Sequence, residues 1–184
     1  MDLVLSADNG NSLRRWGAED AEAVVAAFAD PLMSTQVAEP LETSEAALRW
    51  IDQRLEAWRS GEAFSWVVVD GDTLVGSVTV AEIDRSNDIG WASYWTAPWA
   101  RGKGVASSSL RALSDWAFAH AGLFRLELGH RTNNPASCRV ALAAGYTVEG
   151  LERQKLRYGE ERFDVELHAR LATDPPPESP SIPG

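Results

Sequence analysis

The stretch Ala97-Pro98-Trp99-Ala100-Arg101-Gly102-Lys103-Gly104-Val105-Ala106 decides the expected fold of this chain. It follows the strand-like run Ile89–Thr96 and precedes a segment with helical spacing of apolar residues from Ser107 to about Ala121. The next strand-like run is Phe124–Leu128. A strand, a tight turn, a helix and a second strand in this order predict a right-handed parallel crossover.

The turn in this stretch is also suited to bind an anion. Gly102 and Gly104 let the backbone approach a ligand without Cβ clashes. The helix start presents unpaired N–H groups and the positive end of the helix dipole. Arg101 and Lys103 add positive charge at the same point. We therefore expect a site for a group such as a pyrophosphate; the alternative is a turn whose basic residues simply face water.

Length and composition favour one compact domain, which we place at residues 1–172. The chain has 184 residues, 45% hydrophobic and 24% charged. Residues 173–184 hold five of the nine prolines and are expected to form a disordered tail. No apolar run reaches the roughly 18 residues of a membrane span, and the N-terminus lacks the features of a signal peptide. With Cys138 as its single cysteine, the chain is expected to be cytoplasmic, without a membrane segment or an internal disulfide.

The distribution of charge favours a small anionic ligand over a large one. The net charge of −10 argues against nucleic acid or an anionic membrane as a partner. Residues 101–139 nevertheless hold six basic and two acidic side chains. A locally basic segment in an acidic protein suits a small polyanion, unless these charges face water on different sides.

The whole pattern predicts an α+β fold with a mixed sheet, in which an antiparallel meander precedes the crossover. Before the turn, the expected elements are extended pieces at 3–5 and 13–16, helices at 18–29 and from Thr43 or Ser44 to Gly61, and strands at 64–69, 74–82 and 89–96. After the crossover they are a helix from Pro135 to Gly145 and strands at 146–149 and 163–171, joined by residues 153–162.

Three short signatures in this order resemble the GNAT superfamily of acyl-CoA-dependent N-acyltransferases, and within it the RimJ/RimL-type protein acetyltransferases. Residues 101–106 fit the superfamily's Arg/Gln-x-x-Gly-x-Gly/Ala turn. Asn134-Pro135-Ala136-Ser137 with Ala144-Gly145-Tyr146 fits the pattern Asn-x-x-Ser followed by Gly-Phe/Tyr. Glu149-Gly150 with Arg153 and Asp164 fits the Glu-Gly-x-x-Arg…Asp ending. The resemblance spans about residues 13–171.

The resemblance implies an acetyl-CoA site between two splayed strands, 89–96 and 124–128. The pyrophosphate would rest on N–H groups between Gly102 and Ser107, and the pantetheine arm would pair with the backbone of 95–97, like an added strand. A backbone N–H there would point at the thioester carbonyl, and Asn134 would hydrogen-bond the arm. The implied binding residues are Trp95, Thr96, Ala97, Arg101, Gly102, Lys103, Gly104, Val105, Ala106, Ser107, Asn134 and Ser137.

The implied chemistry is direct attack of a neutral amine on the thioester, which needs a base for the amine and an acid for the departing thiolate. Many relatives use a Tyr as the acid, but that position is Ala141 here. RimL-like enzymes place a Ser where Ser137 stands, so Ser137 is the candidate acid; a hydroxyl that binds CoA or the helix backbone is the alternative.

The base is less determined, because the Glu of the RimL-like proposal would fall near Leu156. Glu149 is the first candidate, because its strand is expected to face the cleft. Glu82, Asp88 or a water chain are the alternatives, and each carboxylate on its own is more simply structural. An amine with a pKa near about 8 is also partly neutral at pH 7 without a dedicated base.

Other reactive residue types have simpler interpretations. Cys138 is expected to be a small buried residue rather than a nucleophile, because His120, His130 and His168 form no Cys-His-acid pattern in the sequence. The three histidines also lack metal-ligand spacing, so no metal is expected. Three tryptophans in and after the strand-like run 89–96 are expected to pack in the core rather than to stack on nucleic-acid bases. They are Trp91, Trp95 and Trp99.

These observations favour an N-acetyltransferase that uses acetyl-CoA and acts on a protein N-terminus or a small-molecule amine; another acyl donor such as succinyl-CoA is an alternative. A non-catalytic acyl-CoA-binding module is a second hypothesis. A nucleotide-dependent oxidoreductase is disfavoured, because Ser107 replaces the third glycine of the dinucleotide fingerprint and the meander does not fit a doubly wound sheet. Resembling enzymes are often dimers, so a homodimer is compatible with this interpretation.

Overall fold

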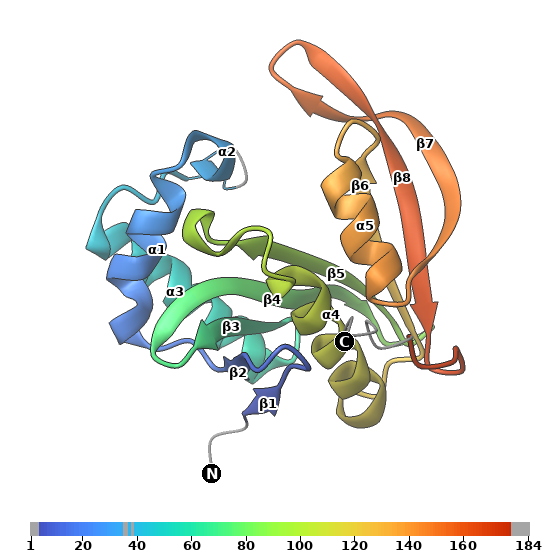
Figure 1. Cartoon of the computed structure of the whole chain (residues 1–184), viewed down its shortest axis with the longest axis horizontal. Helices are drawn as coiled ribbons and strands as arrows, with labels where there is room; N and C mark the ends of the chain where they lie inside the picture. Colours follow the sequence, from blue (N-terminus) through green and yellow to red (C-terminus); the bar gives the residue numbers. More distant parts are fainter. Residues whose placement is uncertain (1–3, 35–36, 38, 178–184) are drawn as a thin grey trace, which may run out of the picture.

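The structure is a computed structural model that describes residues 4–34, 37 and 39–177 (Figure 1). Its helices are α1 (Ala21–Phe28), α2 (Pro31–Ser34), α3 (Ser44–Ser60), α4 (Val105–His120) and α5 (Pro135–Ala143), with 3-10 turns η1 (Ala18–Asp20) and η2 (Pro98–Ala100). Its strands are β1 (Leu5–Ser6), β2 (Ser12–Arg14), β3 (Phe64–Asp70), β4 (Thr73–Asp84), β5 (Ile89–Thr96), β6 (Arg125–Arg131), β7 (Thr147–Tyr158) and β8 (Glu161–Leu171).

The strands form one mixed sheet in the order β1-β2-β3-β4-β5-β6-β8-β7. All neighbouring strands are antiparallel except β5 and β6, which are parallel and are connected through α4. The predicted meander and crossover are therefore confirmed. Of the described residues, no helix is long and apolar enough to cross a membrane.

The helix boundaries follow from local capping. The side chain of Thr43 accepts from the backbone N–H of Ala46 and starts α3, and Gly61 ends it in the left-handed conformation, at φ 76°. Asn134 caps α5 in the same way, with Pro135 in the first turn. Both starts were predicted from the sequence, because the capping side chain and the N–H it satisfies lie only three residues apart.

An aromatic cluster joins the two long helices to the sheet. Trp58 of α3, Phe64 and Trp66 of β3, and Trp116 of α4 pack with ring centroids 4.7 to 5.8 Å apart. Residues Ser65 to Val69 of β3 are all buried, which shows that both faces of this strand are covered. The aromatic cluster therefore packs α3 and α4 against β3 in the centre of the core.

The strands β5 and β6 are splayed, as predicted. They pair only through Ile89 with Arg125, Gly90 with Leu126 and Trp91 with Glu127. Beyond these pairs they diverge, and β6, β8, β7 and α5 form a separate arm (Figure 1).

The expectation that residues 153–162 form a loop between two short strands is wrong. β7 and β8 are 12 and 11 residues long, and only Gly159 and Glu160 lie between them. β7 is exposed along most of its length, and its register shifts between Val148 and Gly150 and again between Glu152 and Leu156. Because the strand has no buried face and its register is interrupted, its sequence lacks the apolar alternation that identifies a strand.

The part of the expected tail that the structure describes lies against the domain. The backbone N–H of Leu171 donates to the side chain of Asp174 at 2.8 Å. A Cβ placed on Gly145 would lie 3.3 Å from Pro177. Residues 178–184 lie outside the described residues, and their disorder remains a prediction.

Candidate active site

A cleft of about 1040 Å³ opens where β5 and β6 diverge. Its walls come from α2, β5, the turn before α4, the end of β6, the first turns of α5 and the tip of β7. The predicted site residues in its lining are Trp95, Thr96, Arg101, Gly102, Gly104, Val105, Ala106, Ser107, Asn134 and Ser137. Ala97, Lys103 and Glu149 are not in the lining.

The turn before α4 presents open backbone donors to the cleft. Gly102 and Gly104 have φ of 78° and 72°, in the left-handed region that favours glycine. Gly104 is the N-cap of α4 and has no capping side chain. Within the described part of the chain, no acceptor bonds the N–H groups of Gly104 to Ser107; the first bond of the helix runs from Ser108 N to Gly104 O. This is the arrangement that binds anionic groups at helix N-termini.

The basic residues of the turn differ in their surroundings. The Arg101 guanidinium lies 3.2 Å from a carboxylate oxygen of Asp30, which follows α1, and this contact lowers the pKa of that carboxyl. Lys103 is exposed and lies outside the cleft lining. Arg101 therefore bridges the turn to the N-terminal helices, and it still lines the cleft.

The open edge of β5 offers backbone groups to a ligand. The N–H of Ala97 donates to Val75 O on β4 at 2.9 Å, so this residue is engaged away from the cleft. Alternate residues of an antiparallel strand direct their polar groups to opposite edges. Tyr94 and Thr96 therefore direct theirs toward the edge that β6 has left. Of the backbone contacts expected at Trp95, Thr96 and Ala97, only that of Thr96 lies on the open edge.

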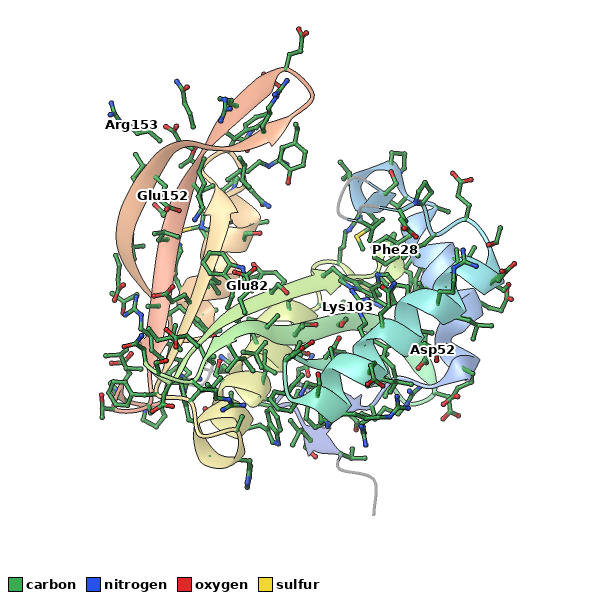
Figure 2. All side chains as sticks on the ribbon, turned by 180° about the vertical axis from the view of Figure 1, so that it is seen from behind. Phe28, Asp52, Glu82, Lys103, Glu152 and Arg153 are labelled. Atoms are coloured by element: carbon green, nitrogen blue, oxygen red, sulfur yellow. The ribbon has the colours of Figure 1, made fainter. Side chains whose placement is uncertain are left out.

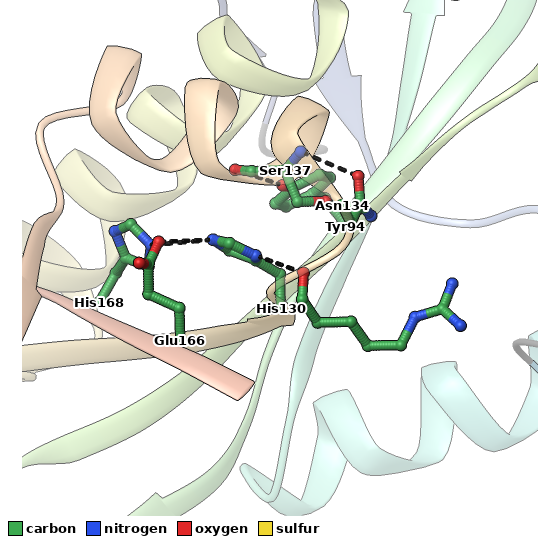
Figure 3. Close-up of polar contacts among 7 residues, drawn as sticks. Tyr94, His130, Asn134, Ser137, Glu166 and His168 are labelled. Atoms are coloured by element: carbon green, nitrogen blue, oxygen red, sulfur yellow. Dashed lines mark hydrogen bonds and ion pairs between the residues drawn. The ribbon is translucent and has the colours of Figure 1, made fainter. Parts of the chain in front are cut away.

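Asn134 and Ser137 form a defined pair at the start of α5 (Figure 3). The side-chain oxygen of Asn134 accepts from Ser137 N at 3.2 Å, and its amide nitrogen donates to Ser137 Oγ at 2.9 Å. Because Ser137 Oγ is already an acceptor of this bond, its own proton is left to be donated elsewhere. The Tyr94 hydroxyl donates to the Ser137 carbonyl at 3.3 Å.

Tyr94 is a cleft residue that the sequence analysis missed. It lies between the predicted Trp95 and the core of β5, and burial raises the pKa of its hydroxyl. The sequence does contain a sign of this position: Tyr94 lies two residues before Thr96, so in a strand both residues direct their backbone groups to the same edge. Its contact with α5 depends on the tertiary structure alone.

The expectation that Glu149 faces the cleft is wrong. Both of its carboxylate oxygens contact the guanidinium of Arg125, which lowers the pKa of Glu149. Arg125 lies at the end of β6 where β5 is still paired to it, whereas the cleft opens at the opposite end. The alternatives Glu82 and Asp88 are also absent from the lining; Glu82 lies on β4, while Glu152 and Arg153 lie on the outer strand β7 (Figure 2).

Four reactive side chains that lie apart in the sequence meet beside the cleft. The Nε2 atoms of His130 and His168 are 2.9 Å apart, and an oxygen of Glu166 lies 3.3 and 3.1 Å from them. Cys138 completes a group whose ligand atoms all lie within 4.8 Å of one another. Cys138 is half-buried rather than buried as expected, and the histidines and the acid that lie near it form no pattern in the sequence.

Comparison with known proteins matches the fold and the motifs. The family described as acetyltransferase (GNAT) domain matches residues 12–147. The ribosomal-protein-serine acetyltransferase of Escherichia coli K12 is 26% identical over 131 residues, which cover 71% of this chain and 73% of that protein.

Solved structures of the same fold contain coenzyme A. RimJ of Mycobacterium smegmatis, in complex with a CoA disulfide, has a TM-score of 0.83 and 22% identity, covering 93% of this chain and 87% of that one. RimL, a ribosomal L7/L12 alpha-N-protein acetyltransferase in complex with coenzyme A, has a TM-score of 0.82 and 21% identity, covering 92% and 98%. The family match thus confirms the predicted resemblance to the GNAT superfamily, and the RimJ and RimL structures share the fold of this chain.

Proposed function

This chain belongs to the GNAT acetyltransferase family, and from that premise we propose that it transfers the acetyl group of acetyl-CoA to a primary amine. The observation that carries the proposal is the set of open N–H groups from Gly104 to Ser107 at the wall of a cleft between splayed strands. Those donors and the helix dipole fit the pyrophosphate of the coenzyme. The basic side chains Arg101 and Arg139 line the same cleft and would add charge.

The donor would lie along the open edge of β5. Backbone groups of Tyr94 and Thr96 would pair with the amide groups of the pantetheine arm, as in the addition of a peptide strand. This position brings the thioester toward the first turn of α5, where Ser137 lines the cleft. The side-chain amide of Asn134 already makes two hydrogen bonds to Ser137. A contact between Asn134 and the pantetheine arm of the coenzyme would therefore use the second amide hydrogen or the second lone pair of the amide oxygen.

In the proposed reaction, the amine nitrogen attacks the thioester carbon. The C–S bond breaks, the electron pair goes to sulfur, and Ser137 Oγ donates its proton to the thiolate. The proton that the amine loses goes to solvent, because a neutral amine needs no carboxylate to attack. Ser137 Oγ takes a proton back from solvent, so that the serine ends neutral and the net products are the amide and the free thiol. The bond from Asn134 Nδ2 to Ser137 Oγ would stabilise the serine oxygen as it gives up its proton.

The acceptor would enter between α2 and the tip of β7. Leu32 and Met33 line one side of this end of the cleft, and Leu156 and Tyr158 line the other. The guanidinium of Arg131 stacks on Tyr158, with 4.9 Å to the ring centroid. An apolar mouth of this kind suits the first residues of a peptide, and the description of RimL as an alpha-N-protein acetyltransferase favours a protein N-terminus over a small amine.

The experiment is a thiol-release assay with acetyl-CoA and succinyl-CoA against a panel of N-terminal peptides and small amines. The variant Ser137→Ala should lower kcat about 100-fold or more while CoA affinity changes little. The exposed Ser60→Ala is the matched control and should leave both unchanged. Micromolar CoA binding without thiol release for any acceptor would refute the enzyme and favour a non-catalytic acyl-CoA-binding module.

A further inference from the structure

The cluster of His130, Cys138, Glu166 and His168 is set by the register of two strands and a helix. His130 of β6 stands directly opposite Glu166 of β8, and His168 follows two residues later on the same face of β8. Cys138 comes from α5, and its Sγ lies within 4.8 Å of the ligand atoms of the other three residues. Three separate elements therefore deliver two imidazoles, a carboxylate and a thiol to one point.

The spacing of these side chains matches a metal coordination sphere. The Nε2 atoms of the two histidines and the Glu166 oxygen form a triangle with sides of 2.9, 3.1 and 3.3 Å. A tetrahedral zinc ion with bonds of about 2.0–2.1 Å has ligands about 3.3 Å apart, so the triangle resembles one face of that tetrahedron. All four ligand atoms lie within 4.8 Å of one another, so the Cys138 Sγ is in reach of an ion bound by the other three residues.

The hydrogen-bonding pattern leaves room for a cation. His130 Nδ1 lies 3.0 Å from the carbonyl of Arg131, which is an acceptor only, so Nδ1 carries the hydrogen and the lone pair of Nε2 faces the cluster. A lone pair of Nε2 and a carboxylate oxygen then converge on His168 Nε2, which has one hydrogen to share between them. A cation would accept the lone pairs of His130 Nε2 and of the Glu166 oxygen, and His168 would join them through Nε2 with its hydrogen on Nδ1, a buried atom that has no hydrogen-bond partner among the described residues. The Arg131 carbonyl behind His130 is a usual outer partner of such a ligand.

We propose that His130, Cys138, Glu166 and His168 form a Zn²⁺ site that ties α5 to β6 and β8. Two histidines, one cysteine and one carboxylate are ligands that zinc accepts, and four protein ligands fill its tetrahedral sphere. His130 and His168 are 8% and 1% exposed, which suits a closed structural site rather than one with an open position for substrate.

The zinc ion would hold the first turn of α5, because Cys138 follows Ser137 directly in that helix. It would therefore stabilise the arm and fix the height of α5 above the sheet. The ion would bind whether or not the chain transfers an acetyl group, so failure of one proposal is distinguishable from failure of the other.

The test uses the full chain, stripped with a chelator and titrated with Zn²⁺ alone and with Co²⁺ alone. We expect one Zn²⁺ per chain, and a rise in Tm of about 5 °C or more at a free Zn²⁺ concentration 100 times Kd. Co²⁺ should give the strong visible bands of tetrahedral coordination together with a thiolate charge-transfer band. These wild-type readouts need no variant to fold.

Two variants localise the ion. Cys138→Ala should remove the charge-transfer band and weaken Zn²⁺ binding at least 100-fold, and Glu166→Gln should weaken it at least 10-fold. His120→Gln, which changes the exposed histidine at the end of α4, should bind Zn²⁺ like the wild type. A wild-type chain that binds no Zn²⁺, or one whose Zn²⁺ binding is unaffected by Cys138→Ala and Glu166→Gln, would overturn the proposal and leave a hydrogen-bonded cluster.

Discussion

Replacing Gly104 by alanine tests the pyrophosphate site, and Gly122 provides a matched control. Both glycines flank α4 in the left-handed conformation, at φ 72° and 67°. A Cβ on either would meet no atom of the described residues within 4 Å. The two substitutions therefore impose the same backbone strain without a clash. They differ in one respect: Gly104 lines the cleft and Gly122 does not.

The expected magnitudes follow from this difference. Placing alanine in the left-handed region costs about 1–2 kcal/mol, so both variants should lose about 2–8 °C in Tm. At Gly104 the added methyl group would stand where the diphosphate approaches the N–H groups. Loss of one charge-assisted hydrogen bond, at about 1.5–3 kcal/mol, corresponds to about a 10- to 100-fold weaker affinity for CoA.

The measurement combines thermal unfolding with calorimetric titration of CoA into each folded variant. Gly104→Ala should bind CoA at least 10-fold more weakly than Gly122→Ala, although the two have similar Tm. Pantetheine, which lacks the diphosphate, should not distinguish them. Equal CoA affinities for the two variants would refute the assignment of the diphosphate to this turn.

Three further predictions concern the arm. Asn134→Ala should destabilise the chain by about 1 kcal/mol, because it removes the cap of α5. Asn134→Asp should keep the cap and lose only the donor to Ser137. Both variants should lower kcat, and unchanged turnover in Asn134→Asp would argue against a role for that bond. Leu126→Ala, at a fully buried site of β6, should cost about 2–5 kcal/mol in denaturant unfolding, and a loss below about 1 kcal/mol would contradict the packing. Arg125 lowers the pKa of Glu149, so their pair stabilises the fold above pH 4.5 and loses that stabilisation as pH falls further. Glu149→Gln should cost less than about 1 kcal/mol at pH 7 and should reduce the loss of stability below pH 4.5. An unchanged loss of stability in that pH range would show that the pair contributes nothing.

The sequence was most informative where the deciding interactions are local. The caps at Thr43 and Asn134 and the glycine-rich turn before α4 depend on residues within a few positions of each other. The alternation of strands and a helix around that turn then limits the crossover to one hand. These features predicted the mixed sheet and the crossover, whereas the splayed strands and the cleft between them were implied by the resemblance to the GNAT superfamily.

Long-range register decided the rest. The strand β7 has no buried face to mark it, so its length became visible only through its pairing with β8. Glu149 was assigned to the cleft from its strand alone, but the guanidinium of Arg125, 24 residues away, holds it elsewhere.

For the proposed zinc ligands, the sequence missed a group of residues that the fold brings together. His130, Cys138 and His168 show no metal-ligand spacing along the chain, and they meet only because β6 pairs with β8 under α5. Hydrophobic periodicity and capping are properties of neighbouring residues, and the sequence determines them by itself. Which side chains converge from distant strands depends on how those strands align, and only the folded chain decides that.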